Sequence, residues 1–152
     1  MSMVLGEYEG RIDAKGRVAL PSKFRSGIRN QLIITKGYEQ TLIIVSVEGW
    51  RTLLEGTERK PLIQKETREV QRFLLGGASA VSVDGKGRIL IPSYLRAFAK
   101  IEEDVIFLGL SRYIEVWAKK RWNEHKRLLE ENIGRISEKL VPWEIKKGET
   151  NA

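Results

Sequence analysis

Lysine and arginine side chains in a short repeated block are the residues of this sequence best suited to chemistry, and that chemistry is phosphate binding. The block runs from Asp13 to Arg25 and occurs again from Asp84 to Arg96, 71 positions later and without a gap. Seven of its thirteen positions are identical, and most of the others exchange one apolar residue for another. So close a repeat indicates the duplication of one structural unit.

Each copy of the block carries more cations than carboxylates, in a chain whose 27 Lys and Arg outnumber 20 Asp and Glu. A basic excess favours a polyanionic partner. Lysine neutralises phosphates and releases counterions, and arginine also binds guanine through paired hydrogen bonds in the major groove. One block offers few contacts, so affinity requires several copies acting together. We interpret four residues as nucleic-acid contacts: Lys15, Arg17, Lys86 and Arg88.

The block also has a purely structural interpretation. Asp13 and Asp84 can accept hydrogen bonds from backbone amides a few residues further on, and Gly16 and Gly87 tolerate the positive φ of tight turns. We favour this turn-forming role for both residue types. In this structural interpretation Arg17 and Arg88 could pair with the aspartates, and the basic residues of the block could form an ordinary solvated surface. For the lysines and arginines we favour nucleic-acid contact, with the structural role as the alternative.

Short strands and helices must position the two turns. Apolar residues alternate with polar ones, or run as β-branched groups, in segments typical of strands. Three- and four-residue spacing of apolar residues is typical of helices, and Pro21 and Pro92 suit a first helical turn. The polar stretch 56–61 is expected to separate two of the helices. We predict strands at 4–12, 17–20, 32–35, 42–45, 80–83, 88–91, 105–108 and 113–117, and helices at 22–28, 47–54, 63–74, 92–100 and 122–140.

The last predicted helix carries a heptad-like apolar stripe on one face. Its members are Trp122, Leu129, Ile133, Ile136 and Leu140. We favour packing of this stripe on its own domain, and a contact between subunits is the alternative. Pro142 is expected to end the helix, and the role of the basic tail that follows stays open.

The residue inventory argues against catalysis and metal binding. The chain has no cysteine and one histidine, His125, in a charged run without a partner nucleophile. No G-x-S-x-G elbow or Walker-type loop occurs, and one histidine with scattered carboxylates makes no metal site. We therefore expect no enzyme activity, no cofactor and no small-molecule ligand. Without a signal pattern or an apolar run of ~20 residues, we also expect a soluble, intracellular chain with no membrane partner.

The tandem motifs resemble those of the MraZ family of bacterial regulators. The resemblance lies in D-A-K-G-R-V-A-L-P and D-G-K-G-R-I-L-I-P, joined by a helical linker, each of which contains D-x-x-x-R. It extends to R-E-V-Q-R at 68–72, F-L-L-G at 73–76 and I-E-V-W at 114–117. One D-x-x-x-R is a weak signal, but two at this separation form a specific one.

The resemblance implies a β-rich α+β fold of two tandem SpoVT/AbrB-like units that interlock as a swapped-hairpin barrel. In related single-unit proteins two chains supply the two units, whereas one chain here would supply both as a pseudo-dimer. The expected domains are a first SpoVT/AbrB-like unit at 7–50, a helical linker at 51–77, a second unit at 78–122, and a C-terminal helix and tail at 123–152.

The resemblance also implies a function. Proteins of this family assemble into closed rings, bind repeated short boxes of double-stranded DNA upstream of the division and cell-wall gene cluster, and control transcription there, usually as repressors. They are cytoplasmic and associate with the nucleoid. The positions that match the family's DNA contacts are Arg17, Arg88, Lys15 and Lys86. Arg25 and Arg96 lie in the same block, but could equally face a neighbouring subunit or an internal carboxylate.

Two other functions stay open, because a fold alone does not fix function. The first is an antitoxin-like module that binds another protein through the predicted helices from Trp50 to Leu75 and from Trp122 to Leu140. The second is a protein that coats the nucleoid without sequence preference.

Overall fold

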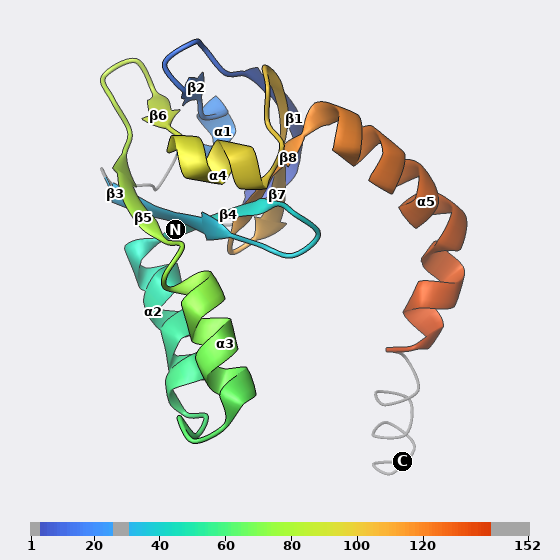
Figure 1. Cartoon of the computed structure of the whole chain (residues 1–152). Helices are drawn as coiled ribbons and strands as arrows, with labels where there is room; N and C mark the ends of the chain where they lie inside the picture. The colour runs from blue at the N-terminus through green and yellow to red at the C-terminus, as the bar shows by residue number, and fades with distance from the viewer. Residues whose placement is uncertain (1–3, 26–30, 141–152) are drawn as a thin grey trace. The chain divides into compact units, whose positions relative to one another are not determined.

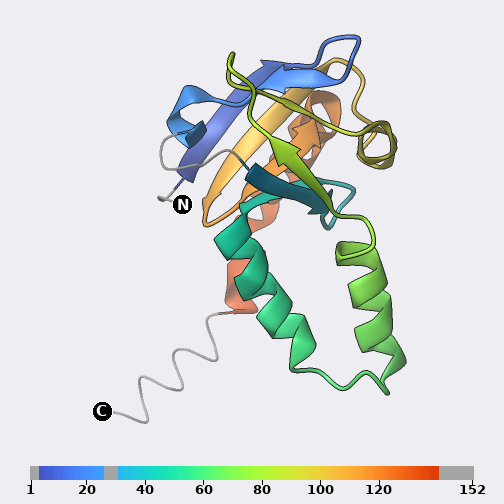
Figure 2. The ribbon, with the colours of Figure 1, turned by 90° about the vertical axis from the view of Figure 1, so that its left-hand side faces the viewer.

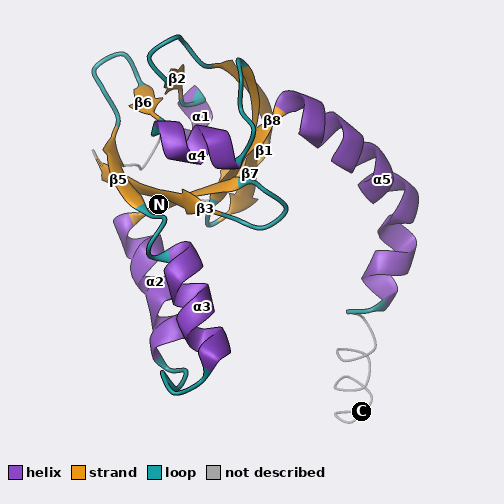
Figure 3. Ribbon diagram, viewed as in Figure 1, coloured by secondary structure: helices purple, strands orange, loops and turns teal. Residues whose placement is uncertain are grey.

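The computed structural model describes residues 4–25 and 31–140, and it contains both helices and strands (Figures 1 and 3). Residues 26–28 of one predicted helix, and Pro142 with the tail, lie outside the described residues. The elements in chain order are β1 (Val4–Arg11), β2 (Arg17–Ala19), α1 (Ser22–Arg25), β3 (Gln31–Lys36), β4 (Leu42–Ser46), α2 (Val47–Glu58), α3 (Lys65–Leu74), β5 (Ser79–Ser82), β6 (Arg88–Leu90), α4 (Ser93–Phe98), β7 (Asp104–Ser111), β8 (Ile114–Ala118) and α5 (Lys119–Glu138).

The strands form one six-stranded antiparallel sheet and one two-stranded ribbon. The order in the sheet is β1-β7-β8-β4-β3-β5, and the ribbon pairs β2 with β6. Strands from the two halves of the chain interleave. β1 pairs with β7 over its whole length, and β5 pairs with β3. The first strand of each half is therefore hydrogen-bonded to a hairpin of the other half.

The sheet is open, so the prediction of a closed barrel is wrong. Closure would require the outer edges of β1 and β5 to pair with each other, because a barrel has no free edge. Instead the chain turns after each of these strands and continues into the separate β2–β6 ribbon. The coarser prediction of a mixed, sheet-rich α+β fold is confirmed, while the swapped-hairpin arrangement stays a prediction.

An apolar core fills the space between the sheet and the ribbon. The β2–β6 ribbon, α1 and α4 lie over one face of the sheet, and α2 and α3 extend from the other side of β3 and β4 (Figures 1 and 2). Val18 and Ile89, which are opposite one another in the ribbon, are both 1% exposed. Phe24 of α1 is fully buried and meets the Tyr8 ring edge to face at 5.0 Å.

The alternation of side chains along the ribbon follows from this packing. In each ribbon strand only the middle residue is buried. Because neighbouring residues in a strand point to opposite faces, Arg17 and Arg88 lie on the outward face. The core therefore decides which face of the ribbon displays the arginines.

The helices α2 and α3 form a hairpin joined by an exposed loop. Ser46 begins α2 by accepting a hydrogen bond from Gly49 N at 3.0 Å. α2 continues to Glu58, so the predicted break at 56–61 begins three residues too early. The fully buried Thr35 donates from Oγ1 to Leu74 O at 2.6 Å, which ties the end of α3 to β3.

The chain divides into two compact units, and most of α5 belongs to the second, which begins at Lys120. The predicted helix is confirmed. Of its apolar stripe, Ile133 is 51%, Ile136 42% and Leu140 74% exposed. Packing of this stripe on its own domain stays a prediction, with a contact between subunits as the alternative. Within the described residues, no helix is both long and apolar enough to cross a membrane.

Cutting the loop of the α2–α3 hairpin tests the interleaving of the two halves. A protease site inserted between Glu58 and Lys65 would fall among exposed residues. Because β1 pairs with β7 and β5 with β3, we expect the two fragments to co-elute at the position of the uncut protein on size exclusion and to separate only in denaturant. Separate elution of the fragments in native buffer would contradict the pairing.

Candidate nucleic-acid interface

The first turn, between β1 and β2, is built around one carboxylate. Asp13 Oδ1 accepts hydrogen bonds from Lys15 N and Arg17 N, both at 2.9 Å. Asp13 Oδ2 accepts from Arg17 Nε at 3.1 Å. The backbone closes the turn, with Gly16 N donating to Asp13 O at 3.0 Å. A single aspartate thus holds both the turn and the arginine that follows it.

The second turn, between β5 and β6, repeats this geometry. Asp84 Oδ1 accepts from Lys86 N and Arg88 N, both at 2.9 Å, and Oδ2 accepts from Arg88 Nε at 2.9 Å. Gly87 N donates to Asp84 O at 2.9 Å. Because every bond has its counterpart in the first turn, the sequence repeat is also a repeat of local structure.

These hydrogen bonds stabilise the charged form of both aspartates. The Arg17 amide, opposed in part by desolvation and then joined by the Lys15 amide and the Arg17 guanidinium, lowers the pKa of Asp13 below its usual value. The Arg88 amide, with the corresponding contributions, does the same to the pKa of Asp84. Each carboxylate is therefore ionised throughout the physiological range and pairs with its arginine.

Each arginine is restrained by this pair but keeps donors free. Within the guanidinium of Arg17 and of Arg88, only Nε is bonded to the aspartate. In the described parts of the chain, the Nη groups of these two residues have no partner, and the side chains are 35% and 28% exposed. Since guanidinium carries further N–H donors on Nη1 and Nη2, each arginine can still bind an acceptor outside the chain.

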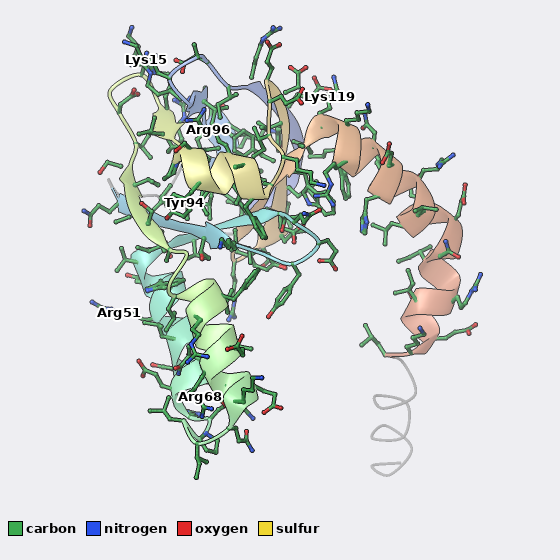
Figure 4. All side chains as sticks on the ribbon, in the orientation of Figure 1. Lys15, Arg51, Arg68, Tyr94, Arg96 and Lys119 are labelled. Carbon is green, nitrogen blue, oxygen red and sulfur yellow. The ribbon has the colours of Figure 1, made fainter. Side chains whose placement is uncertain are left out.

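The two lysines are exposed, and the described residues provide no partner for their ammonium groups. Lys15 extends away from the ribbon (Figure 4). Both turns lie at the same end of the first unit, away from the α2–α3 hairpin (Figures 1 and 2). The structure therefore brings Lys15, Arg17, Lys86 and Arg88 together at one end of this unit.

Arg25 and Arg96 lie beside the turns, but each lies beside the turn of the other copy. A Cβ placed on Gly16 would be 2.9 Å from Arg96 Cζ, and a Cβ on Gly87 would overlap Arg25 Nη1. Neither arginine forms an ion pair with a carboxylate of the described chain. Sequence reasoning left their contacts open and missed this exchange, because no local pattern signals which copy an arginine reaches.

The two glycines are required for two reasons. Gly16 has φ 87° and Gly87 has φ 77°, in the left-handed region that disfavours other residues. Each also lies where a side chain would meet an arginine. The carbonyls of both glycines also accept hydrogen bonds from the opposite copy. Ile91 N donates to Gly16 O, and Leu20 N donates to Gly87 O, both at 2.9 Å. The glycines therefore connect the two turns to each other.

No group of three or more His, Asp or Glu side chains that could hold a metal ion occurs among residues 4–25 and 31–140. The chemistry at the two turns is that of fixed positive charge and hydrogen-bond donation.

Comparison with known proteins connects this geometry to one family. The family described as "MraZ protein, putative antitoxin-like" matches twice in tandem, at residues 3–73 and 74–141. The chain is 43% identical to the transcriptional regulator MraZ of Caldanaerobacter subterraneus subsp. tengcongensis, over 94% of this chain and 100% of the relative. It is 42% identical to the same-named protein of Thermoanaerobacter pseudethanolicus, over 91% and 96%, and 41% identical to that of Acetivibrio thermocellus, over 91% and 97%.

Alanine at Gly87 should destabilise the protein, whereas alanine at Gly85 should not. Gly87 combines a positive φ with the Arg25 contact, so we expect Gly87→Ala to lower the free energy of unfolding by about 1–3 kcal/mol. Gly85 lies in the same turn with open space around it, and Ala14 stands at its counterpart in the first copy. Gly85→Ala should change stability by less than about 0.5 kcal/mol in the same urea titration. Equal effects of the two variants would contradict this assignment.

Acid should remove the stabilisation that comes from the two aspartates. Because their folded pKa is lowered, this stabilisation is complete above the ordinary aspartate pKa, about 4, and is lost as the pH falls through the lower folded pKa. The variant Asp13→Asn/Asp84→Asn keeps an oxygen for the backbone amides but cannot accept from arginine and does not titrate. We expect the native chain to be the more stable at pH 6 and the difference to shrink below about pH 4. A difference independent of pH in urea unfolding would rule out the ion pairs as its source.

Proposed function

This chain belongs to the MraZ family, whose named relatives are transcriptional regulators, and from that membership we propose that it binds repeated short boxes of promoter DNA through its paired turns. The chain is itself a transcription regulator. The proposal concerns how it contacts DNA, where, and in what assembly.

The observation that carries the proposal is the outward face of the β2–β6 ribbon. Arg17 is opposite Leu90 and Arg88 is opposite Ala19, so the arginines are two positions apart on neighbouring strands. Strand dimensions place their Cα atoms roughly 8 Å apart. A major groove about 12 Å wide admits a two-stranded ribbon, so both arginines fit into one groove. Lys15 and Lys86 then extend from the two turns toward the flanking phosphates.

The aspartates contribute to binding by restraining the arginines. A free arginine side chain loses rotamer entropy when it binds, and the Nε bond to Asp13 or Asp84 removes part of that cost beforehand. The Nη groups are then available for paired hydrogen bonds to guanine or to a phosphate. In this proposal the lysines supply affinity through charge and the arginines supply sequence preference.

The wider proposal follows the family. One ribbon makes few contacts, so several copies in a ring-like homo-oligomer would bind several DNA boxes at once. The target would be the promoter of its own division and cell-wall gene cluster, and the effect repression. The protein would then act in the cytoplasm, in association with the nucleoid. A swapped-hairpin organisation of the two units belongs to this proposal too.

Removal of the two lysines tests the proposal with little effect on the fold. We expect Lys15→Ala/Lys86→Ala to weaken binding to a promoter fragment at least tenfold at 0.15 M salt and to reduce the slope of log affinity against log salt by about 0.9 for each lost phosphate contact. Lys60→Ala/Lys65→Ala is the matched control, because it removes the same charge from exposed positions at the far end of the hairpin. Arg17→Ala/Arg88→Ala should abolish binding while circular dichroism stays unchanged. Affinity that stays unchanged in both turn variants would refute the proposal.

The same titrations separate the alternatives. A promoter fragment and random DNA compete at fixed salt, and only a specific regulator retains a large affinity ratio. A ratio near one would favour a protein that coats the nucleoid without sequence preference.

One observation favours protein binding as a second candidate function. Leu62 and Ile63 at the tip of the α2–α3 hairpin are 64% and 87% exposed. Arg68 Nη1 donates to Leu62 O at 2.7 Å and to Ile63 O at 2.9 Å, so the loop that displays them is held in place. The family description as antitoxin-like agrees with such a surface. A stoichiometric protein partner that is retained by the native chain, lost in Ile63→Glu, and bound without DNA would support this function.

A further inference from the structure

We propose that Arg25 and Arg96 are crossed positioning residues, each of which fixes the DNA-binding turn of the opposite repeat. One binding element then consists of a turn from one half of the chain and an arginine from the other. The consequence for DNA rests on the proposed function, whereas the crossing itself is a property of the folded chain and can be tested without DNA.

The closest contacts of the two glycines carry this inference. Around Gly16, the three atoms nearest to an added Cβ are Arg96 Cζ at 2.9 Å, Nη2 at 3.0 Å and Nε at 3.1 Å. Around Gly87, all three belong to Arg25. The guanidinium of Arg96 therefore lies against the backbone of the first turn, and the guanidinium of Arg25 against that of the second. In Figure 4, Arg96 comes from α4 and lies among the side chains beneath the turns.

Arg96 is part of a closed set of contacts across the repeats. Its Nε donates to Ile91 O at 3.0 Å, and Ile91 N donates to Gly16 O at 2.9 Å. The guanidinium then covers Gly16 itself. The fully buried Leu95 anchors α4 beneath this arginine. Two contacts thus join the second repeat to Gly16 of the first turn, and the bond from Arg96 Nε to Ile91 O connects the two residues that make them.

The contacts of Arg25 are similar but fewer. Leu20 N donates to Gly87 O at 2.9 Å, and the fully buried Phe24 anchors α1. Arg25 is more exposed than Arg96, and in the described residues its side chain has no counterpart to the bond from Arg96 Nε to Ile91 O. We therefore expect the larger effect from removal of Arg96.

The chemistry of these positions favours arginine over lysine. The planar guanidinium can lie flat against a peptide that lacks a Cβ, and it stays charged while it does so. An ammonium group is compact and strongly hydrated, so it covers the same peptide poorly. The arginines exclude water from the turn backbone and hold the lysine and arginine of that turn in one conformation. This lowers the conformational entropy that binding removes.

Hydrogen exchange on the free protein tests the crossing directly. We expect Arg96→Ala to raise the amide exchange rates of Gly16 and Arg17 at least about fivefold, which corresponds to the net free energy of one lost hydrogen bond. The exchange rates of Gly87 and Arg88 should stay nearly unchanged. Arg25→Ala should do the reverse, with a smaller increase. Increased exchange in the turn of the same repeat, or equally in both turns, would overturn the proposal.

A second set of variants covers the case in which the alanine variants also lose stability. Gly16→Ala creates a contact with Arg96, so adding Arg96→Ala should restore part of the lost stability, whereas adding Arg25→Ala should not. Gly87→Ala should show the opposite preference. Additive effects in all four double variants would overturn the crossed contacts.

Salt-dependent DNA binding separates positioning from direct contact. We expect Arg96→Ala and Arg96→Lys to weaken promoter binding about three- to tenfold, the effect of losing one or two ordered side chains, with the salt slope unchanged. A slope that falls by about 0.9 in Arg96→Ala and recovers in Arg96→Lys would identify a phosphate contact and overturn the positioning role. If each arginine variant raises amide exchange in the turn of the opposite repeat but the protein binds no promoter DNA, the proposed function is refuted and the crossing is supported.

Discussion

The hydrogen bonds that one aspartate carboxylate accepts from two backbone amides are the interaction on which the rest of each turn depends. They fix the path of the chain between β1 and β2, and again between β5 and β6. With the path fixed, the glycine must adopt a positive φ and the arginine must lie beside the carboxylate. The charges of the turn therefore follow from its backbone geometry.

The ribbon and the sheet place these two local units together. Val18 and Ile89 are buried, so their neighbours Arg17 and Arg88 face outward. The antiparallel register of β2 and β6 then brings the arginines within the width of one DNA groove. A core that forms only from both halves of the chain thus makes one surface out of two short motifs.

The crossing of the arginines gives this surface a further property. Arg25 and Arg96 are each held against a glycine of the opposite turn, and the glycine carbonyls accept hydrogen bonds across the same boundary. The Asp–Arg pairs act within one turn, whereas these contacts act between repeats. Order in one turn therefore depends on side chains and amides that the other half supplies.

The sequence by itself determined the features that arise from neighbours in the chain. The two turns, the positions of the strands and helices, and the duplication were predictable, because Asp13 bonds to amides two and four residues away and strand patterns are local. Only the tertiary structure decided that the sheet is open, that α2 continues to Glu58, and that Arg96 reaches Gly16. The open sheet and the contact of Arg96 with Gly16 join segments dozens of residues apart, and such contacts depend on how the core packs, which local patterns do not record. The end of α2 is a local boundary that the spacing of apolar residues did not mark, because this helix buries no residue.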